Sequence, residues 1–214
     1  MDFRESPVVL EGFVFIAPLC ALTLVFAYFG NIWTSVLFFC ATLFVANFFR
    51  NPERSVPQDE KAILSPADGR VLSIEEGVVS SLIEGPCKKV SIFMNVFNVH
   101  VNRMPFSGTV TAIEYRPGKF FSANLDKASE LNERNSVVVT TDDGRKILTV
   151  QIAGMVARRI VCWVNEGMEM ARGERFGLIR FGSRLEVFMP SDTEISVTVG
   201  EKVKAGETIV GRLS

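Results

Sequence analysis

The chain begins with an apolar segment unlike the rest of the sequence. Residues 12–49 contain no Asp, Glu, Lys or Arg, and Gly30-Asn31 divides them into two apolar stretches, Phe13–Phe29 and Ile32–Phe49. Each stretch is just long enough for a helix that spans the roughly 30 Å hydrocarbon core of a bilayer, and Gly-Asn favours a tight turn. The pattern predicts an antiparallel helical hairpin associated with a membrane.

The charges that flank this hairpin predict its orientation. Arg4 precedes the first stretch, and Arg50 and Arg54 follow the second. The positive-inside tendency then places both ends of the hairpin on the cytoplasmic face of the cell membrane. A cleaved signal peptide is the alternative, but the second apolar stretch directly after the first argues against it. Pro18 and the short lengths make the spans marginal, so a re-entrant or in-plane hairpin stays open.

Beyond a short polar linker at residues 51–57, the pattern changes to short runs typical of β-strands. These runs are rich in apolar and β-branched residues and are bounded by Gly, Pro or Asp. They are Val90–Phe93, Ser136–Thr141, Ile147–Ala153, Gly177–Phe181 and Leu185–Met189. Asp142-Asp143-Gly144 joins two of them as a hairpin turn, and one helix is expected at Ser122–Arg134.

Two domains and a mostly β (α+β) fold follow from this pattern. Residues 1–50 form the membrane-associated helical hairpin, and residues 51–214 form an antiparallel, barrel-sandwich-like body with one short helix. Two segments support this type of body. Gly200–Glu207 resembles the strand–turn–strand of biotinyl/lipoyl-type domains, and Ser65–Val71 is similar to their opening strand.

Composition excludes some classes of function. The 214 residues include 23 Lys and Arg against 24 Asp and Glu, a net charge of −1, which argues against a nucleic-acid partner. The four cysteines have no CxxC spacing and there is only one histidine, so no metal site is predicted. The cysteines are expected to be reduced thiols that are buried or face lipid.

His100, the single histidine, is one candidate for chemistry, because its ordinary pKa lies near neutrality. Apolar residues from Phe97 to Val101 alternate with polar residues from Asn98 to Asn102. In a strand, the imidazole would therefore point away from the core, toward solvent or a polar cleft. The residues alone leave both a solvated surface histidine and a functional one open.

Asp68 and Gly182-Ser183 are the other candidates. Asp68 follows Pro66-Ala67 and, taken alone, is an ordinary turn residue. Gly182-Ser183 either marks a bulge in a strand-like run or allows the serine hydroxyl to attack the preceding carbonyl, since glycine permits a strained backbone. Such an attack converts the amide to an ester, and elimination and hydrolysis then leave a pyruvoyl group.

Four motifs taken together resemble the signatures of the short-form phosphatidylserine decarboxylases. In chain order they are Ser65–Gly69, Asn98–Pro105, the matches between Phe121 and Asn135, and Arg180–Pro190. They occur in the family's order, and the apolar N-terminus also fits. The resemblance covers nearly the whole chain.

The resemblance implies a self-cleaving lyase. Cleavage between Gly182 and Ser183 would give a large chain (1–182) and a small chain (183–214) that remain together as a heterodimer, with further dimerisation left open. Ser183 would become the covalent pyruvoyl cofactor, which forms a Schiff base with the phospholipid substrate. Phosphatidylserine would yield phosphatidylethanolamine and CO₂ at the membrane.

The resemblance also implies roles for individual residues. His100 would donate the proton that completes decarboxylation, Asp68 would support self-cleavage, and Arg103 and Asn98 are candidates for substrate binding. Longer family members carry a second histidine, assigned to self-cleavage, where this chain has Arg103. Arginine stays protonated, so the base stays open between His100 acting in both steps and Asp68 acting through water.

A membrane-tethered, non-catalytic barrel-sandwich adaptor is the competing hypothesis. Carrier domains need a modifiable lysine at a hairpin tip, and the chain has no Met-Lys dipeptide. An efflux-type adaptor would show a long helical hairpin in its soluble part, and no such pattern is present. Within the enzyme hypothesis, diacyl phosphatidylserine and an ether-linked analogue remain alternative substrates.

Overall fold

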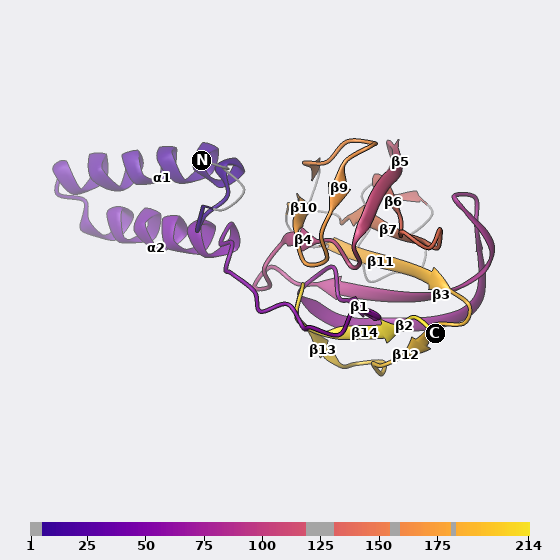
Figure 1. Cartoon of the computed structure of the whole chain (residues 1–214). Coiled ribbons are helices and arrows are strands. Elements are labelled where there is room, and N and C mark those ends of the chain that lie inside the picture. Colours follow the sequence, from indigo (N-terminus) through magenta and orange to yellow (C-terminus); the bar gives the residue numbers. More distant parts are fainter. Residues whose placement is uncertain (1–5, 119–130, 155–158, 181–182) are drawn as a thin grey trace. The chain divides into compact units, whose positions relative to one another are not determined.

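The computed structural model describes residues 6–118, 131–154, 159–180 and 183–214 (Figure 1). The chain divides into two compact units that meet between Glu53 and Arg54, and each is described by itself. Most of the helix expected at Ser122–Arg134 falls outside the described residues, and Arg134 itself begins a strand.

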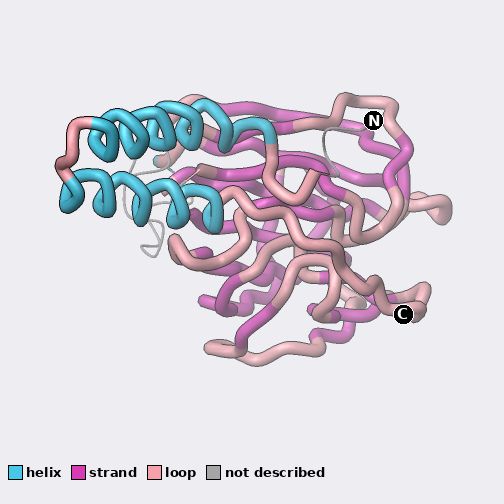
Figure 2. The backbone as a smooth tube through the Cα atoms, turned by 90° about the vertical axis from the view of Figure 1, so that its left-hand side faces the viewer, coloured by secondary structure: helices cyan, strands magenta, loops and turns pink. Residues whose placement is uncertain are grey.

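The first unit is a hairpin of two antiparallel helices, α1 (Leu10–Tyr28) and α2 (Ile32–Phe48), seen side by side in Figure 2. The turn depends on Gly30, whose φ of 72° is readily adopted only without a Cβ atom. Asn31 then caps α2, because its side chain accepts a hydrogen bond from the Thr34 backbone amide at 3.3 Å. The predicted hairpin is confirmed.

Contacts between the two helices hold the hairpin together. The Ser35 hydroxyl donates to the Thr23 carbonyl at 2.9 Å, and the rings of Phe26 and Phe38 stack with centroids 5.5 Å apart. Among the described residues, α1 is long and apolar enough to cross a membrane, whereas α2 is apolar but shorter. This composition favours association of the N-terminal unit with a membrane.

The second unit is built from antiparallel strands in three sheets (Figure 1). The large sheet has eight strands in the order β13-β2-β3-β11-β7-β6-β5-β9, and the two small sheets have the orders β1-β14-β12 and β4-β10-β8. The strands are β1 (Ala62–Leu64), β2 (Gly69–Ser80), β3 (Ile83–Met94), β4 (Val101–Arg103), β5 (Gly108–Arg116), β6 (Arg134–Thr140), β7 (Lys146–Ala153), β8 (Ile160–Cys162), β9 (Glu169–Met170), β10 (Arg175–Ile179), β11 (Ser183–Pro190), β12 (Glu194–Ile195), β13 (Lys202–Val203) and β14 (Ile209–Arg212).

The main core contains side chains from all three sheets. On β11, Leu185 and Val187 lie in this core, while Phe188 packs in a second cluster with Leu148. This alternation is what a strand buried on both faces requires. The predicted mostly β, antiparallel class is confirmed.

Two local expectations are wrong in detail. The segment Ser65–Asp68 is a turn, and β2 begins only at Gly69, where a Cβ atom would lie 2.2 Å from the Phe93 carbonyl oxygen. Around His100, only Val101–Arg103 forms a strand, and the residues on both faces of this strand are buried. The histidine is 2% exposed, so the surface interpretation of His100 is wrong.

Candidate active site

Ser183 is the first residue of β11 and is fully buried. It pairs with Met94 on β3 and with Ala153 on β7, so neighbouring strands flank it on both sides. The Ser183 Oγ lies 3.3 Å from the Met94 Sδ, to which it donates. Gly182 lies outside the described residues, so the predicted cleavage site is described from its serine side.

His100 is oriented by its own segment. Its Nδ1 lies 3.0 Å from the Asn98 carbonyl oxygen, which can only accept, so Nδ1 carries the hydrogen. In the neutral ring, Nε2 is then the nitrogen that can take up a proton. The Ile179 amide donates to the His100 carbonyl at 3.4 Å, which connects the histidine to the strand that ends four residues before Ser183.

Asp68 is held by a partner that the sequence did not suggest. The Arg54 Nη2 donates to both carboxylate oxygens, at 3.0 and 2.9 Å, and the Ala205 amide donates to Oδ1 at 2.8 Å. The side chains of the ion pair are 7% and 13% exposed. Arg54 therefore pairs with Asp68 within the β body, although its position after the apolar segment suggested only a flanking charge.

Arg103 and Asn98 are both engaged by neighbouring backbone. Arg103 is buried, and its Nη1 donates to the Gly173 carbonyl at 2.7 Å. The Asn98 side chain accepts from the Asn95 amide at 2.9 Å. Both residues thus have a local structural role, and their part in substrate binding stays a prediction.

Sequence reasoning missed two sets of buried polar side chains, one connected to Ser183 through Met94 and one on the opposite face of β11. One set contains three amides, Asn102, Gln151 and Asn135, joined by hydrogen bonds. The other follows Ser183 directly: Arg184 Nε lies 3.0 Å from the Glu186 carboxylate, with both side chains nearly inaccessible. The polar positions around His100 were a signal for Asn102, but the partners come from strands distant in sequence.

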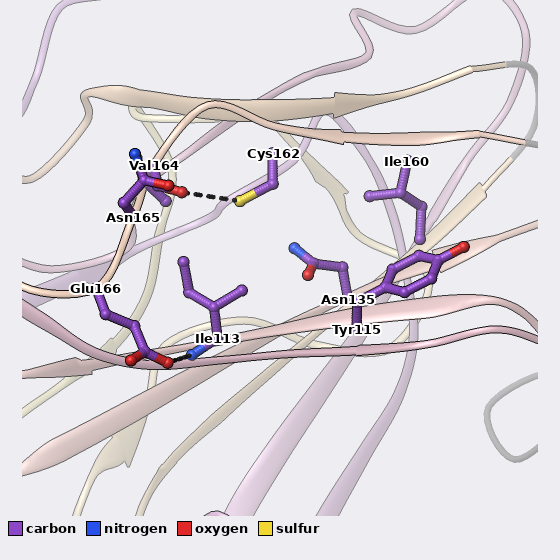
Figure 3. A pocket seen from close by; sticks show the side chains of 8 residues that line it. All are labelled: Ile113, Tyr115, Asn135, Ile160, Cys162, Val164, Asn165 and Glu166. Carbon is purple, nitrogen blue, oxygen red and sulfur yellow. Dashed lines mark hydrogen bonds between the residues drawn. The ribbon is translucent and has the colours of Figure 1, made fainter.

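A pocket of about 640 Å³ opens beside the amide set (Figure 3). Its walls are apolar and polar side chains from β5, β6, β8 and the segment after β8: Ile113, Tyr115, Asn135, Ile160, Cys162, Val164, Asn165 and Glu166. Burial, followed by the negative charge of Glu133, raises the pKa of Tyr115. A phenol is already protonated at neutral pH at its ordinary pKa of about 10, so the Tyr115 hydroxyl can donate there.

The described residues contain no group of three or more His, Cys, Asp or Glu side chains that could hold a metal ion. All four cysteines are free thiols, and burial raises the pKa of Cys87. Of the candidates for chemistry, Ser183 and His100 are buried and Asp68 is half-buried.

The family model and the relatives that match this chain carry the same family name. Residues 41–211 match the model of the phosphatidylserine decarboxylase family. The chain is 60% identical to the phosphatidylserine decarboxylase proenzyme of Syntrophus aciditrophicus over 97% of this chain and 98% of that one. The proenzyme of Desulfotalea psychrophila is 51% identical to this chain over 98% of each of the two chains. The proenzyme of Pelobacter propionicus is 46% identical over 100% of each chain. Since the similarity runs from the helical hairpin to the last strands, this chain belongs to the phosphatidylserine decarboxylase family.

Proposed function

We propose that this chain is a proenzyme that cleaves itself before Ser183 and then decarboxylates phosphatidylserine to phosphatidylethanolamine. The observation that carries the proposal is the buried Ser183 at the start of β11, directly after Gly182, in a chain similar over its full length to proenzymes of this name. The relatives give no support to the alternative of a non-catalytic adaptor.

Self-cleavage begins at the Ser183 hydroxyl. Its proton leaves to a base, Oγ bonds to the carbonyl carbon of Gly182, and the peptide C–N bond breaks to give an ester and a free amine. Loss of the Cα proton then breaks the Cβ–Oγ bond, leaving Gly182 with a carboxylate and residue 183 as dehydroalanine. Addition of water and loss of ammonia yield the pyruvoyl group and the chains 1–182 and 183–214.

The residues present fit this group, because Ser183 is buried and its hydroxyl contacts a thioether rather than an ionised side chain. Once formed, the pyruvoyl group supplies an electron sink for the bond to the departing CO₂. His100 Nε2 is the proposed proton donor to the substrate carbon, with Nδ1 held by Asn98. A buried imidazole with one nitrogen fixed presents the other in a defined direction.

Maturation needs a base, and Arg103 cannot supply it. The position of Asp68 directly before β2 supports it as a participant, since β3 alone lies between β2 and β11 in the sheet. The backbones of β2 and β11 are two interstrand spacings apart, which is a separation of roughly 10 Å. We therefore assign Asp68 an indirect action on Ser183, through water or His100, while Arg54 holds the carboxylate in place.

The membrane is the proposed site of action, with the β body on the cytoplasmic face. The apolar α1 and α2 support this, together with the lipid substrate in the relatives' name. The direct test of the whole proposal is to incubate the purified chain with phosphatidylserine in mixed micelles and measure phosphatidylethanolamine. Denaturing electrophoresis of the same sample should show two chains, and ether-linked and diacyl substrates can be compared in parallel.

Asp68→Asn should accumulate as uncut precursor, because the neutral amide keeps the size of the side chain but cannot take a proton. Arg54→Lys is the matched control. Lysine keeps a positive charge beside Asp68, but it lacks the guanidinium Nη2 that donates to both carboxylate oxygens. The fraction of cut chain over time is the measurement. Fast cleavage of Asp68→Asn would remove Asp68 from the maturation step.

Deletion of residues 1–49 should leave a chain that still cleaves itself but works poorly on bilayer substrate. The deletion retains Arg54 and its ion pair with Asp68. Because the apolar hairpin is lost, the site is no longer held where lipid headgroups lie, and detergent micelles should restore part of the rate. A folded but uncut truncation would contradict this expectation and make the hairpin necessary for maturation.

A further inference from the structure

A continuous series of buried side chains connects Ser183 with the pocket in Figure 3. Asn135 Nδ2 donates to Gln151 Oε1 at 3.0 Å, and Gln151 Nε2 donates to Asn102 Oδ1 at 2.8 Å. Asn102 Nδ2 donates to Met94 Sδ at 3.8 Å, and the same sulfur accepts from Ser183 Oγ at 3.3 Å. We call Asn135, Gln151 and Asn102 the amide relay.

The thioether of Met94 sets the direction of the whole relay. Sulfur in methionine has no hydrogen to donate, so the Asn102 amide must turn its N–H toward it. Its oxygen then faces Gln151 and requires the N–H of that amide, which leaves the Gln151 oxygen to accept from Asn135. A reversed relay would place the Asn102 oxygen against the sulfur, with no hydrogen between them.

Two donors hold the Met94 sulfur at one position. Methionine has three rotatable bonds and adapts readily to irregular spaces, but here Asn102 and Ser183 both donate to its sulfur. A fixed acceptor next to Ser183 selects one rotamer of the serine side chain among the three staggered ones. That rotamer sets the position of Oγ relative to the backbone of Ser183 itself.

The relay is difficult to explain by stability alone. Its three amides and Met94 are buried, and replacing hydrogen-bonded polar pairs by apolar groups of the same shape can be nearly neutral for folding. The rate of an intramolecular attack, in contrast, depends strongly on placement, since a misplacement of about 1 Å can cost about a hundredfold. A rigid polar series that ends at the attacking hydroxyl has its largest effect on that step.

We propose that Gln151 is a positioning residue for self-cleavage: through Asn102 and Met94, it holds the Ser183 hydroxyl in the rotamer that attacks the preceding carbonyl. This inference rests on the proposed function, because it concerns the same bond. The relay acts on Oγ, and Oγ leaves residue 183 when the pyruvoyl group forms. Its effect therefore falls on maturation far more than on turnover.

The test compares Gln151→Met with Met94→Leu in the full chain. Gln151→Met keeps a long side chain but breaks the relay at its centre, and Met94→Leu removes only the acceptor at nearly constant volume. Thr149→Val is the matched control, since Thr149 is a buried polar residue two positions from Gln151 on the same face of β7, outside the relay. Cleavage is followed from synthesis by electrophoresis, and turnover is measured per pyruvoyl group, with thermal melting to confirm folding.

Both relay variants should slow self-cleavage by about 10- to 100-fold, the cost of a misplaced attacking atom, while turnover per pyruvoyl group falls much less. The double variant should be no slower than the slower single variant, because both act through one path. Thr149→Val should be cut at the wild-type rate. Normal cleavage of Gln151→Met and Met94→Leu, or an equal loss in cleavage and turnover, would overturn the inference. An uncut wild-type chain would instead contradict the proposed function.

Discussion

Ser183→Ala should yield a single uncut chain of 214 residues without decarboxylase activity. The Ser183 hydroxyl is the proposed attacking group, and alanine offers no nucleophile in its place. The backbone of residue 183 pairs with β3 and β7 without using the hydroxyl, so removal of one oxygen should leave the sheet intact. Electrophoresis and intact mass measure the cut, and phosphatidylethanolamine formation measures the activity.

Ser136→Ala is a suitable control, since Ser136 is also a buried serine on a strand of the large sheet. It should be cut and active. Borohydride reduction in the presence of substrate should trap a covalent adduct on residues 183–214 of the wild type and none on Ser183→Ala. A processed Ser183→Ala chain, or an adduct on residues 1–182, would refute the pyruvoyl assignment.

His100→Ala should be at least partly cut and nearly inactive. General acid–base assistance is typically worth a factor of about 10²–10⁴ in rate. A single maturation event that is slowed by this factor can still go to completion over hours. Every catalytic cycle, however, needs fast protonation of the substrate carbon. The chain has no other histidine to replace His100, so turnover per cut chain should fall by about that factor.

His100→Gln separates proton transfer from hydrogen bonding. A glutamine amide can occupy the buried site and donate a hydrogen bond, but it cannot release a proton near neutral pH. It should therefore be as inactive as His100→Ala. More than about a tenth of wild-type turnover in either variant, beyond what that range allows, would show that another group protonates the substrate. A wholly uncut His100→Ala chain would make His100 the maturation base as well.

Local patterns were sufficient for much of the fold. The uncharged segment with Gly30-Asn31 at its centre predicted the helical hairpin, and the turn at Asp142–Gly144 was visible between two β-branched runs. Both depend on residues close together in sequence. The alternation around His100 misled because β4 is covered on both faces, and covering strands cannot be read from the segment itself.

The arrangement around the candidate site depended on contacts between distant strands. Arg54 and Asp68, Asn102 and Gln151, and Arg103 and Gly173 meet only because the sheets bring them together. Charge position alone places Arg54 at the edge of the apolar segment and cannot reveal its partner in the β body. Buried polar pairs of this kind have no periodic signal in sequence, since each partner is set by strand order.

Residues 183–214 supply four strands that are distributed through the β body. β11 lies between β3 and β7 in the large sheet, β13 forms its edge beside β2, and β14 pairs with β1 in a small sheet. The proposed cleavage before Ser183 would therefore release no fragment, but it would make recovery from denaturation a second-order process, because two separate polypeptides must find each other. The uncut Ser183→Ala chain should regain its fold at a rate independent of dilution, whereas the mature protein should recover less as it is diluted. Each molecule thus has one opportunity to assemble as a single polypeptide, and that opportunity precedes the first turnover.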